Sequence, residues 1–188
     1  MAQLVPAETF DLVIFGGTGD LAMRKLLPAL YHRDLDGQLT PDSRIIAASR
    51  GEMSREDYVG LVEEALHRNL AEGEFDESLW LTFASRIHYV QADAFAHDEW
   101  SSLVQLLDSV EARVRVAYLA TAPSLFGPIA QGLRHNGLVT DTSRIVLEKP
   151  LGRDLDSARE INDAIAECFE ERQVYRIDHY LGKETVQN

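Results

Sequence analysis

Cysteine and basic residues are scarce in this sequence, and each scarcity excludes a class of protein. The 188 residues include one cysteine, Cys168, so no intrachain disulfide and no multi-cysteine metal site can form, which suits the reducing cytoplasm. Acidic residues outnumber basic ones by 31 to 18, and the formal net charge of -13 repels nucleic acid and anionic membranes. We expect neither as a partner, although a locally basic cleft can still bind an anionic small molecule.

Long apolar runs are missing as well. Nowhere do about 18 apolar residues follow one another, and the opening MAQLVPAETFDL lacks the features of a signal peptide. Cys168 stands in the apolar, helix-like stretch AIAECF without a neighbouring cation, so we interpret it as a small buried hydrophobe rather than a nucleophile. The length suffices for one core. We therefore expect a cytoplasmic protein with one domain and no bound metal.

Short β-branched runs alternate with longer segments of helical period. The pattern predicts strands at residues 10–16, 44–50, 87–93, 113–121, 143–150 and 174–180. The first run, FDLVIFG, is apolar almost throughout, as a parallel strand covered on both faces should be. Strands joined by helical crossovers form a parallel sheet with right-handed connections. We predict an α/β domain over residues 1–188, a Rossmann-like doubly wound sheet with helices on both faces.

Two of the intervening helices carry specific signals. One is expected from about Gly19 to Asp36. The other begins at Ser54, which with Asp57 resembles a capping box. Its period places five residues on one apolar face: Tyr58, Leu61, Val62, Ala65 and Leu66.

A glycine cluster directly follows the first strand. Gly16, Gly17 and Gly19 have the spacing G-x-x-G-x-x-A, with Ala22 in the last place. Glycine here permits positive φ and a close approach to a pyrophosphate, which the start of the next helix stabilises. The spacing departs by one residue from the dinucleotide fingerprint, so a plain tight turn remains an alternative, whereas a P-loop lacks its Gly-Lys-Ser/Thr. Ligands bind beyond the carboxyl ends of parallel strands, so we expect cofactor contacts from Gly16, Gly17, Thr18, Gly19, Asp20, Leu21, Ala120, Pro123 and Lys149.

The second strand ends in Ser49-Arg50. An acidic residue at this place commonly binds the ribose of NAD, whereas the 2′-phosphate of NADP calls for a cation. We predict that Arg50 pairs with this phosphate and that the cofactor is NADP. A solvated surface arginine is the alternative, and Glu52 leaves NAD open as a second cofactor.

Four segments narrow the function: GGTGDLAMRKLLPALY, YLATAPSLF, VLEKPLGRDL and YRIDHYLGKETVQN. In this order, and along the whole chain, they resemble glucose-6-phosphate dehydrogenases, and the string RIDHYLGK is the most specific. One departure is Ala122, where family members often have a second proline. The resemblance implies NADP-dependent oxidation of glucose 6-phosphate to 6-phosphogluconolactone, the entry to the pentose phosphate pathway, by hydride transfer from sugar C1.

The resemblance also implies roles for residues near the sugar. His179, Tyr180 and Lys183 would hold the sugar phosphate, and their N–H, O–H and ammonium groups suit about two negative charges. Asp178 would orient a histidine base that comes from a second, β+α domain, which we expect to be absent from this chain. Lys149, before a Pro150 expected to be cis, would contact the sugar.

Lys25 would join Lys149 at the sugar, although a solvated lysine and an ordinary E-K-P surface turn are the alternatives for these two residues. The chain alone is then expected to be inactive, and its full-length form to be a homo-oligomer through the absent domain. Another Rossmann sugar oxidoreductase and a non-catalytic NADP-binding module are the alternative functions.

Overall fold

A computed structural model describes residues 8–110 and 113–177, so the predicted sites at Asp178, His179, Tyr180 and Lys183 lie outside the described residues. Within these residues a six-stranded sheet has the order β3-β2-β1-β4-β5-β6, and every pairing is parallel. The strands are β1 (Phe10–Phe15), β2 (Arg44–Ser49), β3 (Ile87–Gln91), β4 (Val114–Leu119), β5 (Arg144–Glu148) and β6 (Val174–Ile177). The predicted doubly wound α/β class is confirmed, and each predicted range contains the observed strand.

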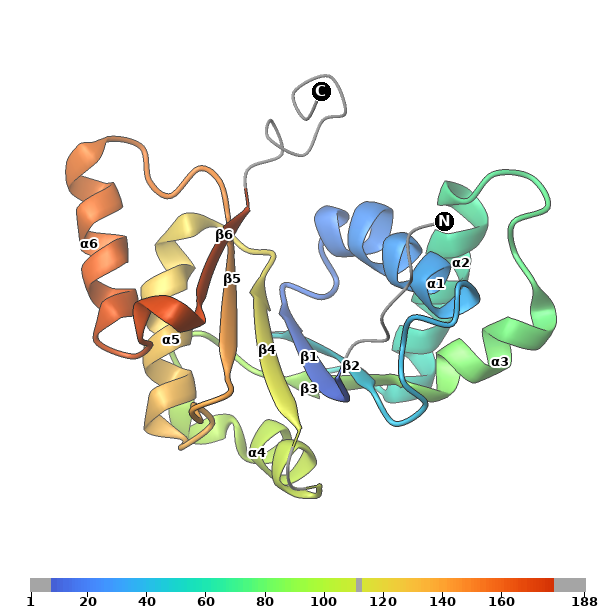
Figure 1. Ribbon diagram of the computed structural model, residues 1–188, viewed down its shortest axis with the longest axis horizontal. Coiled ribbons are helices and arrows are strands. Elements are labelled where there is room, and N and C mark those ends of the chain that lie inside the picture. Colours follow the sequence, from blue (N-terminus) through green and yellow to red (C-terminus); the bar gives the residue numbers. More distant parts are fainter. Residues whose placement is uncertain (1–7, 111–112, 178–188) are drawn as a thin grey trace.

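Helices cover both faces of the sheet (Figure 1). On one face lie η1 (Ala22–Leu26), α1 (Leu27–Leu35), α2 (Arg55–Asn69) and α3 (Glu77–Ser85). On the other lie η2 (His97–Glu99), α4 (Ser101–Asp108), η3 (Pro123–Leu125), α5 (Phe126–His135), α6 (Leu155–Ala166) and η4 (Glu171–Gln173). Each layer buries its own apolar cluster against the sheet, which explains why the central strands are apolar on both faces.

The strand order reverses beside β1. This strand pairs with β2 on one side and with β4 on the other, and Phe15 is in register with both Ala48 and Leu119. The chain leaves β1 toward one helical layer and leaves β4 toward the other. In sheets of this kind the crevice for a ligand lies beyond the carboxyl ends of the strands at this point.

The first helix is less regular than predicted. It opens with the π-helical turn η1, in which the amide of Leu27 donates to the carbonyl of Ala22. Pro28 stands at the start of α1. Because proline has no amide hydrogen and crowds the carbonyl four residues earlier, a widened turn before it accommodates the ring.

The predicted start of α2 is correct, but the prediction that five residues share one buried face is wrong for one of them. Ser54 caps the helix, accepting a hydrogen bond from the amide of Asp57 at 3.0 Å. Tyr58 and Val62 are buried, but Leu61 is 39% exposed. At about 100° per residue, Leu61 stands roughly 85° from the centre of the buried stripe, at its border with solvent.

Cys168 lies just beyond α6, half-buried against the core of that layer. Burial raises the pKa of its thiol. This agrees with a packing role, because a nucleophilic cysteine needs a lowered pKa.

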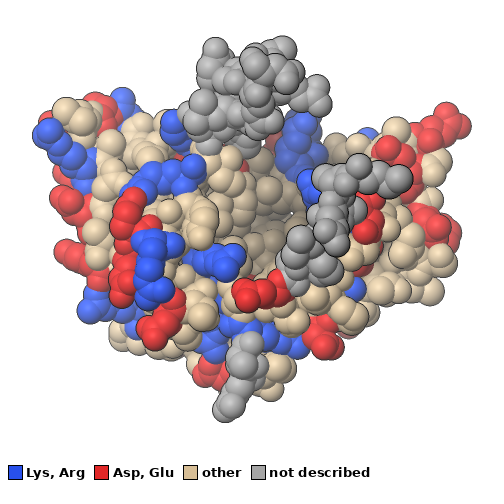
Figure 2. All heavy atoms as spheres, in the orientation of Figure 1, with Lys and Arg blue, Asp and Glu red and all other residues tan. Residues whose placement is uncertain are grey.

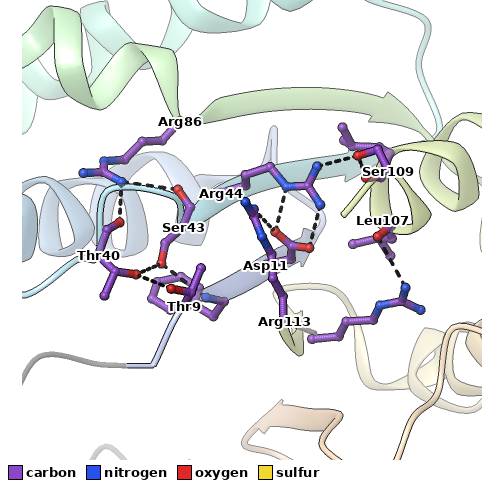
Figure 3. A network of polar contacts seen from close by, with 12 residues as sticks. Thr9, Asp11, Thr40, Ser43, Arg44, Arg86, Leu107, Ser109 and Arg113 are labelled. Carbon is purple, nitrogen blue, oxygen red and sulfur yellow. Dashed lines mark hydrogen bonds and ion pairs between the residues drawn. The ribbon is translucent and has the colours of Figure 1, made fainter. Parts of the chain in front are cut away.

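The amino-terminal edge of the sheet carries a buried network of charges (Figure 3). Arg44 donates to both carboxylate oxygens of Asp11, at 2.7 and 2.6 Å, and Arg113 adds a third bond at 3.1 Å. Nearby, Arg86 bonds to the carbonyl of Ser43 at 3.4 Å and to Asp34 at 3.1 Å. These bonds join the starts of β1, β2 and β4 at the edge opposite the predicted site.

Candidate functional site

A cleft of about 610 Å³ lies where β1, β2, β3 and β4 end. Figure 2 shows a hollow at this edge, between α1 and the strands β4 to β6, with a mostly uncharged visible lining. The cleft is walled by residues that follow these strands, among them Gly16, Thr18, Gly19, Ser49, Arg50, Gly51, Asp93, Ala120 and Thr121. The structure thus brings Gly16, Thr18, Gly19, Arg50 and Ala120 to one cleft.

The glycine turn is held tightly between two strands. Gly16 has φ +82, and its amide donates to the carbonyl of Ala48 at 2.9 Å. A Cβ on Gly16 would lie 2.5 Å from the carbonyl oxygen of Ala120, and one on Gly17 would lie 2.5 Å from the Cβ of Ala47. Side chains are therefore excluded from both positions, and the backbone itself forms the floor of the cleft.

The turn is also held from α2. The buried hydroxyl of Tyr58 donates to the carbonyl of Gly17 at 2.8 Å. Burial, and then the neighbouring Tyr89, raise the pKa of Tyr58, so the phenol stays a hydrogen-bond donor. Tyr89 in turn donates to the carbonyl of Gly51 at 2.5 Å. Sequence reasoning missed this tyrosine pair. The one signal was a tyrosine, rather than an aliphatic residue, on the apolar face of α2.

No side chain among the described residues caps the helix after the turn at Leu21. The amide of Met23 donates to the carbonyl of Gly19 at 3.0 Å, and the amides that precede it at the start of a helix have no acceptor inside the helix. These amides and the helix dipole favour an anion. Asp20 is exposed and forms an ion pair with Arg24 at 3.4 Å. Thr18 lines the cleft and lies 3.1 Å from Ser49, oxygen to oxygen.

Arg50 lines the cleft near its β2 and β3 walls. Its carbonyl accepts a hydrogen bond from Gln91 at 3.0 Å, which fixes the backbone there. In the part of the chain that the structure describes, its exposed guanidinium contacts no carboxylate. Glu52 is exposed and does not line this cleft. The site therefore offers one cation to an anionic group at this end.

The E-K-P segment follows β5. Glu148 is buried and accepts a hydrogen bond from the hydroxyl of Tyr118, whose pKa is raised by burial and by this carboxylate. The Lys149–Pro150 bond is cis, as predicted, and Lys149 is exposed. Glu148 is in register with Ile177, the last described residue of β6.

Six predicted residues that the structure describes do not line the first cleft: Gly17, Asp20 and Leu21 in and after the glycine turn, and Pro123, Lys25 and Lys149. Pro123 lines a second cleft of about 570 Å³ between α5 and α6, together with Pro150. Lys25 is exposed on η1, and neither it nor Lys149 lines either cleft.

The described residues contain no cluster of three or more His, Cys, Asp or Glu side chains suited to a metal ion. None of the helices among them combines the length and apolarity needed to cross a membrane.

Residues 13–188 match the family model described as "Glucose-6-phosphate dehydrogenase, NAD binding domain". The chain belongs to the glucose-6-phosphate dehydrogenase family. It is 51% identical over 187 residues to the glucose-6-phosphate 1-dehydrogenase of Rhizobium meliloti, and 49% identical over 190 residues to that of Gluconobacter oxydans. These matches cover 100% of the chain but only 38% and 39% of the two relatives.

The chain is also similar to a solved structure of a glucose-6-phosphate dehydrogenase "in complex with its substrate glucose-6-phosphate". The match covers 100% of this chain and 40% of the solved chain, with a TM-score of 0.84 and 34% sequence identity. The chain is thus the coenzyme-binding domain of this family, a domain of the NAD(P)-binding type. Its cleft fits a dinucleotide of this type because the backbone of the glycine turn packs against Ala47 and Ala120, with no space for a Cβ at Gly16 or Gly17, and Gly16 and Gly19 line the cleft without side chains.

Proposed function

We propose that this chain is the NADP-binding portion of an enzyme that oxidises glucose 6-phosphate to 6-phosphogluconolactone. The bound cofactor supplies the hydride acceptor, C4 of its nicotinamide ring, and the protein supplies orientation and electrostatics. The observation that carries this proposal is the single cleft joining the glycine turn after β1 to Arg50 after β2, in a domain of the glucose-6-phosphate dehydrogenase family.

The cofactor is held from its two charged parts. The amides that begin the helix after Gly19 donate to the diphosphate, which the turn admits because Gly16 and Gly19 carry no side chains. Arg50 forms charge-assisted bonds to the 2′-phosphate. Both roles are local, so they are compatible with a chain whose net charge is -13.

The sugar is held at the ends of β5 and β6. Glu148 and Ile177 are paired across these strands, and Lys149 and Asp178 are the residues that follow them along the sequence. Lys149, with Lys25, contacts the sugar, while His179, Tyr180 and Lys183 bind its phosphate. Asp178 orients a histidine base that removes the C1 hydroxyl proton.

That histidine belongs to a part of the enzyme beyond this chain, which spans 38% of the length of its Rhizobium relative. The chain alone then binds the dinucleotide without turnover, as a non-catalytic module would. We also propose that the complete enzyme is a cytoplasmic homo-oligomer assembled through the other domain. Turnover of glucose 6-phosphate by a chain extended through that domain supports the enzyme, and rapid turnover by these 188 residues argues against the assigned base.

Cofactor choice is tested by titrating NADP⁺ and NAD⁺ into the wild type and Arg50→Ala by calorimetry. Loss of charge-assisted bonds to the 2′-phosphate weakens NADP⁺ binding by about tenfold to a hundredfold, while NAD⁺ binding changes less than about twofold because it lacks that phosphate. Arg68→Ala is the control, since Arg68 lies on α2 in an exposed pair with Glu64 at 3.3 Å. An equal loss for both cofactors would remove Arg50 from the proposed role.

A further inference from the structure

Thr121 follows β4 and lines the same cleft as the glycine turn and Arg50. Its hydroxyl oxygen is buried and has no hydrogen-bond partner. Among the side chains that the structure describes, it is the single buried nitrogen or oxygen atom in this condition. Buried hydroxyls are almost always paired, and an unpaired one at a ligand cleft calls for an explanation.

The orientation of the Thr121 side chain offers an explanation for the unpaired hydroxyl. Its methyl carbon Cγ2 is the atom that faces the glycine turn, only 3.0 Å from the place that a Cβ on Gly16 would occupy. A threonine side chain has three staggered positions about its Cα–Cβ bond, and one step moves the hydroxyl into the place of the methyl group while the methyl group takes the place of the hydrogen. The same step brings the hydroxyl from its unpaired position to the side of the turn.

The neighbours do not offer an alternative partner. Thr121 stands between Ala120 and Ala122, neither of which has a polar side chain. The backbone oxygen of Gly16, in the turn itself, already accepts from the amide of Gly19 at 2.8 Å. A phosphate oxygen placed against the turn would be a hydrogen-bond acceptor, which is the partner that the hydroxyl lacks.

We propose that Thr121 rotates on cofactor binding and that its hydroxyl donates a hydrogen bond to a diphosphate oxygen of the dinucleotide. This inference rests on the proposed cofactor site and adds a specificity for the diphosphate, separate from that of Arg50 for the 2′-phosphate. NADP and NAD carry the same diphosphate, so Thr121 serves both cofactors equally.

The test is Thr121→Val, which keeps the shape of the side chain and removes the hydroxyl. NADP⁺ and NAD⁺ should each bind about tenfold more weakly, the effect of one charge-assisted hydrogen bond. ADP-ribose, which keeps the diphosphate without nicotinamide, should lose the same factor, whereas 2′-AMP, which lacks the diphosphate, should lose nothing. The melting temperature of the ligand-free variant should equal or exceed that of the wild type, because an unpaired buried hydroxyl has been removed.

Two further variants complete the experiment. Thr121→Ser restores a hydroxyl and should recover most of the affinity. Thr142→Val removes a hydroxyl that lies 3.3 Å from that of Thr140, away from the cleft, and should leave every affinity unchanged. The inference is overturned if Thr121→Val binds the dinucleotides like the wild type, if ADP-ribose escapes the loss, or if the ligand-free variant melts lower in proportion to the lost affinity. Should the wild type bind no dinucleotide at all, the proposed function fails with it; a selective Arg50→Ala loss beside an unaffected Thr121→Val overturns this inference alone.

Discussion

Replacing Asp11 with asparagine should destabilise the chain strongly and leave cofactor binding intact. Asp11 is 0% exposed and accepts hydrogen bonds from Arg44 and Arg113. Removing one partner of a buried ion pair costs about 3–5 kcal/mol, because the remaining charges lose their compensation. For a chain of this size each kcal/mol lowers the melting temperature by roughly 2–4 °C, so the expected loss is about 6–20 °C.

Calorimetric and urea unfolding of the same chain measure this loss. The matched control is Asp108→Asn, which breaks a 2.8 Å pair with Arg115 in which the aspartate is 59% exposed; it should cost at most about 1 kcal/mol. NADP⁺ affinity should be unchanged in both variants, because Asp11 lies near the start of β1, whereas the cleft lies where that strand ends. If Asp11→Asn costs no more than Asp108→Asn, the network does not stabilise this edge in the way described.

Two further predictions concern pH and backbone packing. Burial, Arg55 and Arg44 lower the pKa of His88 below its ordinary value of 6.5, so unfolding takes up a proton and the free energy of unfolding should fall as pH drops below about 6.5. The free energy of unfolding, measured by urea titration at several pH values, should fall less at low pH in His88→Gln than in the wild type. If it falls equally in both proteins, His88 is not the cause. Gly17→Ala should cost about 1–3 kcal/mol through overlap with Ala47, whereas Gly60→Ala, which meets nothing within 4 Å in α2, should gain up to about 1 kcal/mol. Equal melting temperatures for these two glycine variants would refute the packing argument.

Periodicity was sufficient to predict the sheet, because the property that it reads is the one that builds these strands. β1 is apolar on both faces and is covered by a helical layer on each. The rule that ligands bind beyond carboxyl ends of parallel strands also placed Arg50 and the glycine turn at the same edge before their contacts were known. The π-helical turn before Pro28 and the exposure of Leu61 depend on finer geometry than a repeat of helical period carries.

The polar contacts of the cleft could not be predicted from the periodicity of the sequence. The bond from Tyr58 to Gly17 joins residues 41 positions apart, and the unpaired hydroxyl of Thr121 is defined by everything packed around it. Neither has a local pattern in the sequence. The roles of Asp178 and its neighbours come from resemblance to a family and stay predictions, since they lie outside the described residues.

The polar groups at one edge of the sheet are paired within the protein, whereas some of those at the other edge are not. This difference is the physical reason for placing the functional site at the second edge. At the amino edge Arg44, Arg113 and Arg86 are all paired with carboxylates inside the protein, so their charges stabilise the fold and have little left to offer a ligand. At the carboxyl edge, in the described part of the chain, the guanidinium of Arg50 and the hydroxyl of Thr121 have no protein partner. The buried, unpaired hydroxyl lowers the stability of the empty domain, and a ligand that pairs with it returns that free energy as affinity. The exposed guanidinium is hydrated, so it can offer its charge to a ligand at little cost in stability. These are the interactions that the fold leaves unmade and that, in the proposed function, a dinucleotide completes.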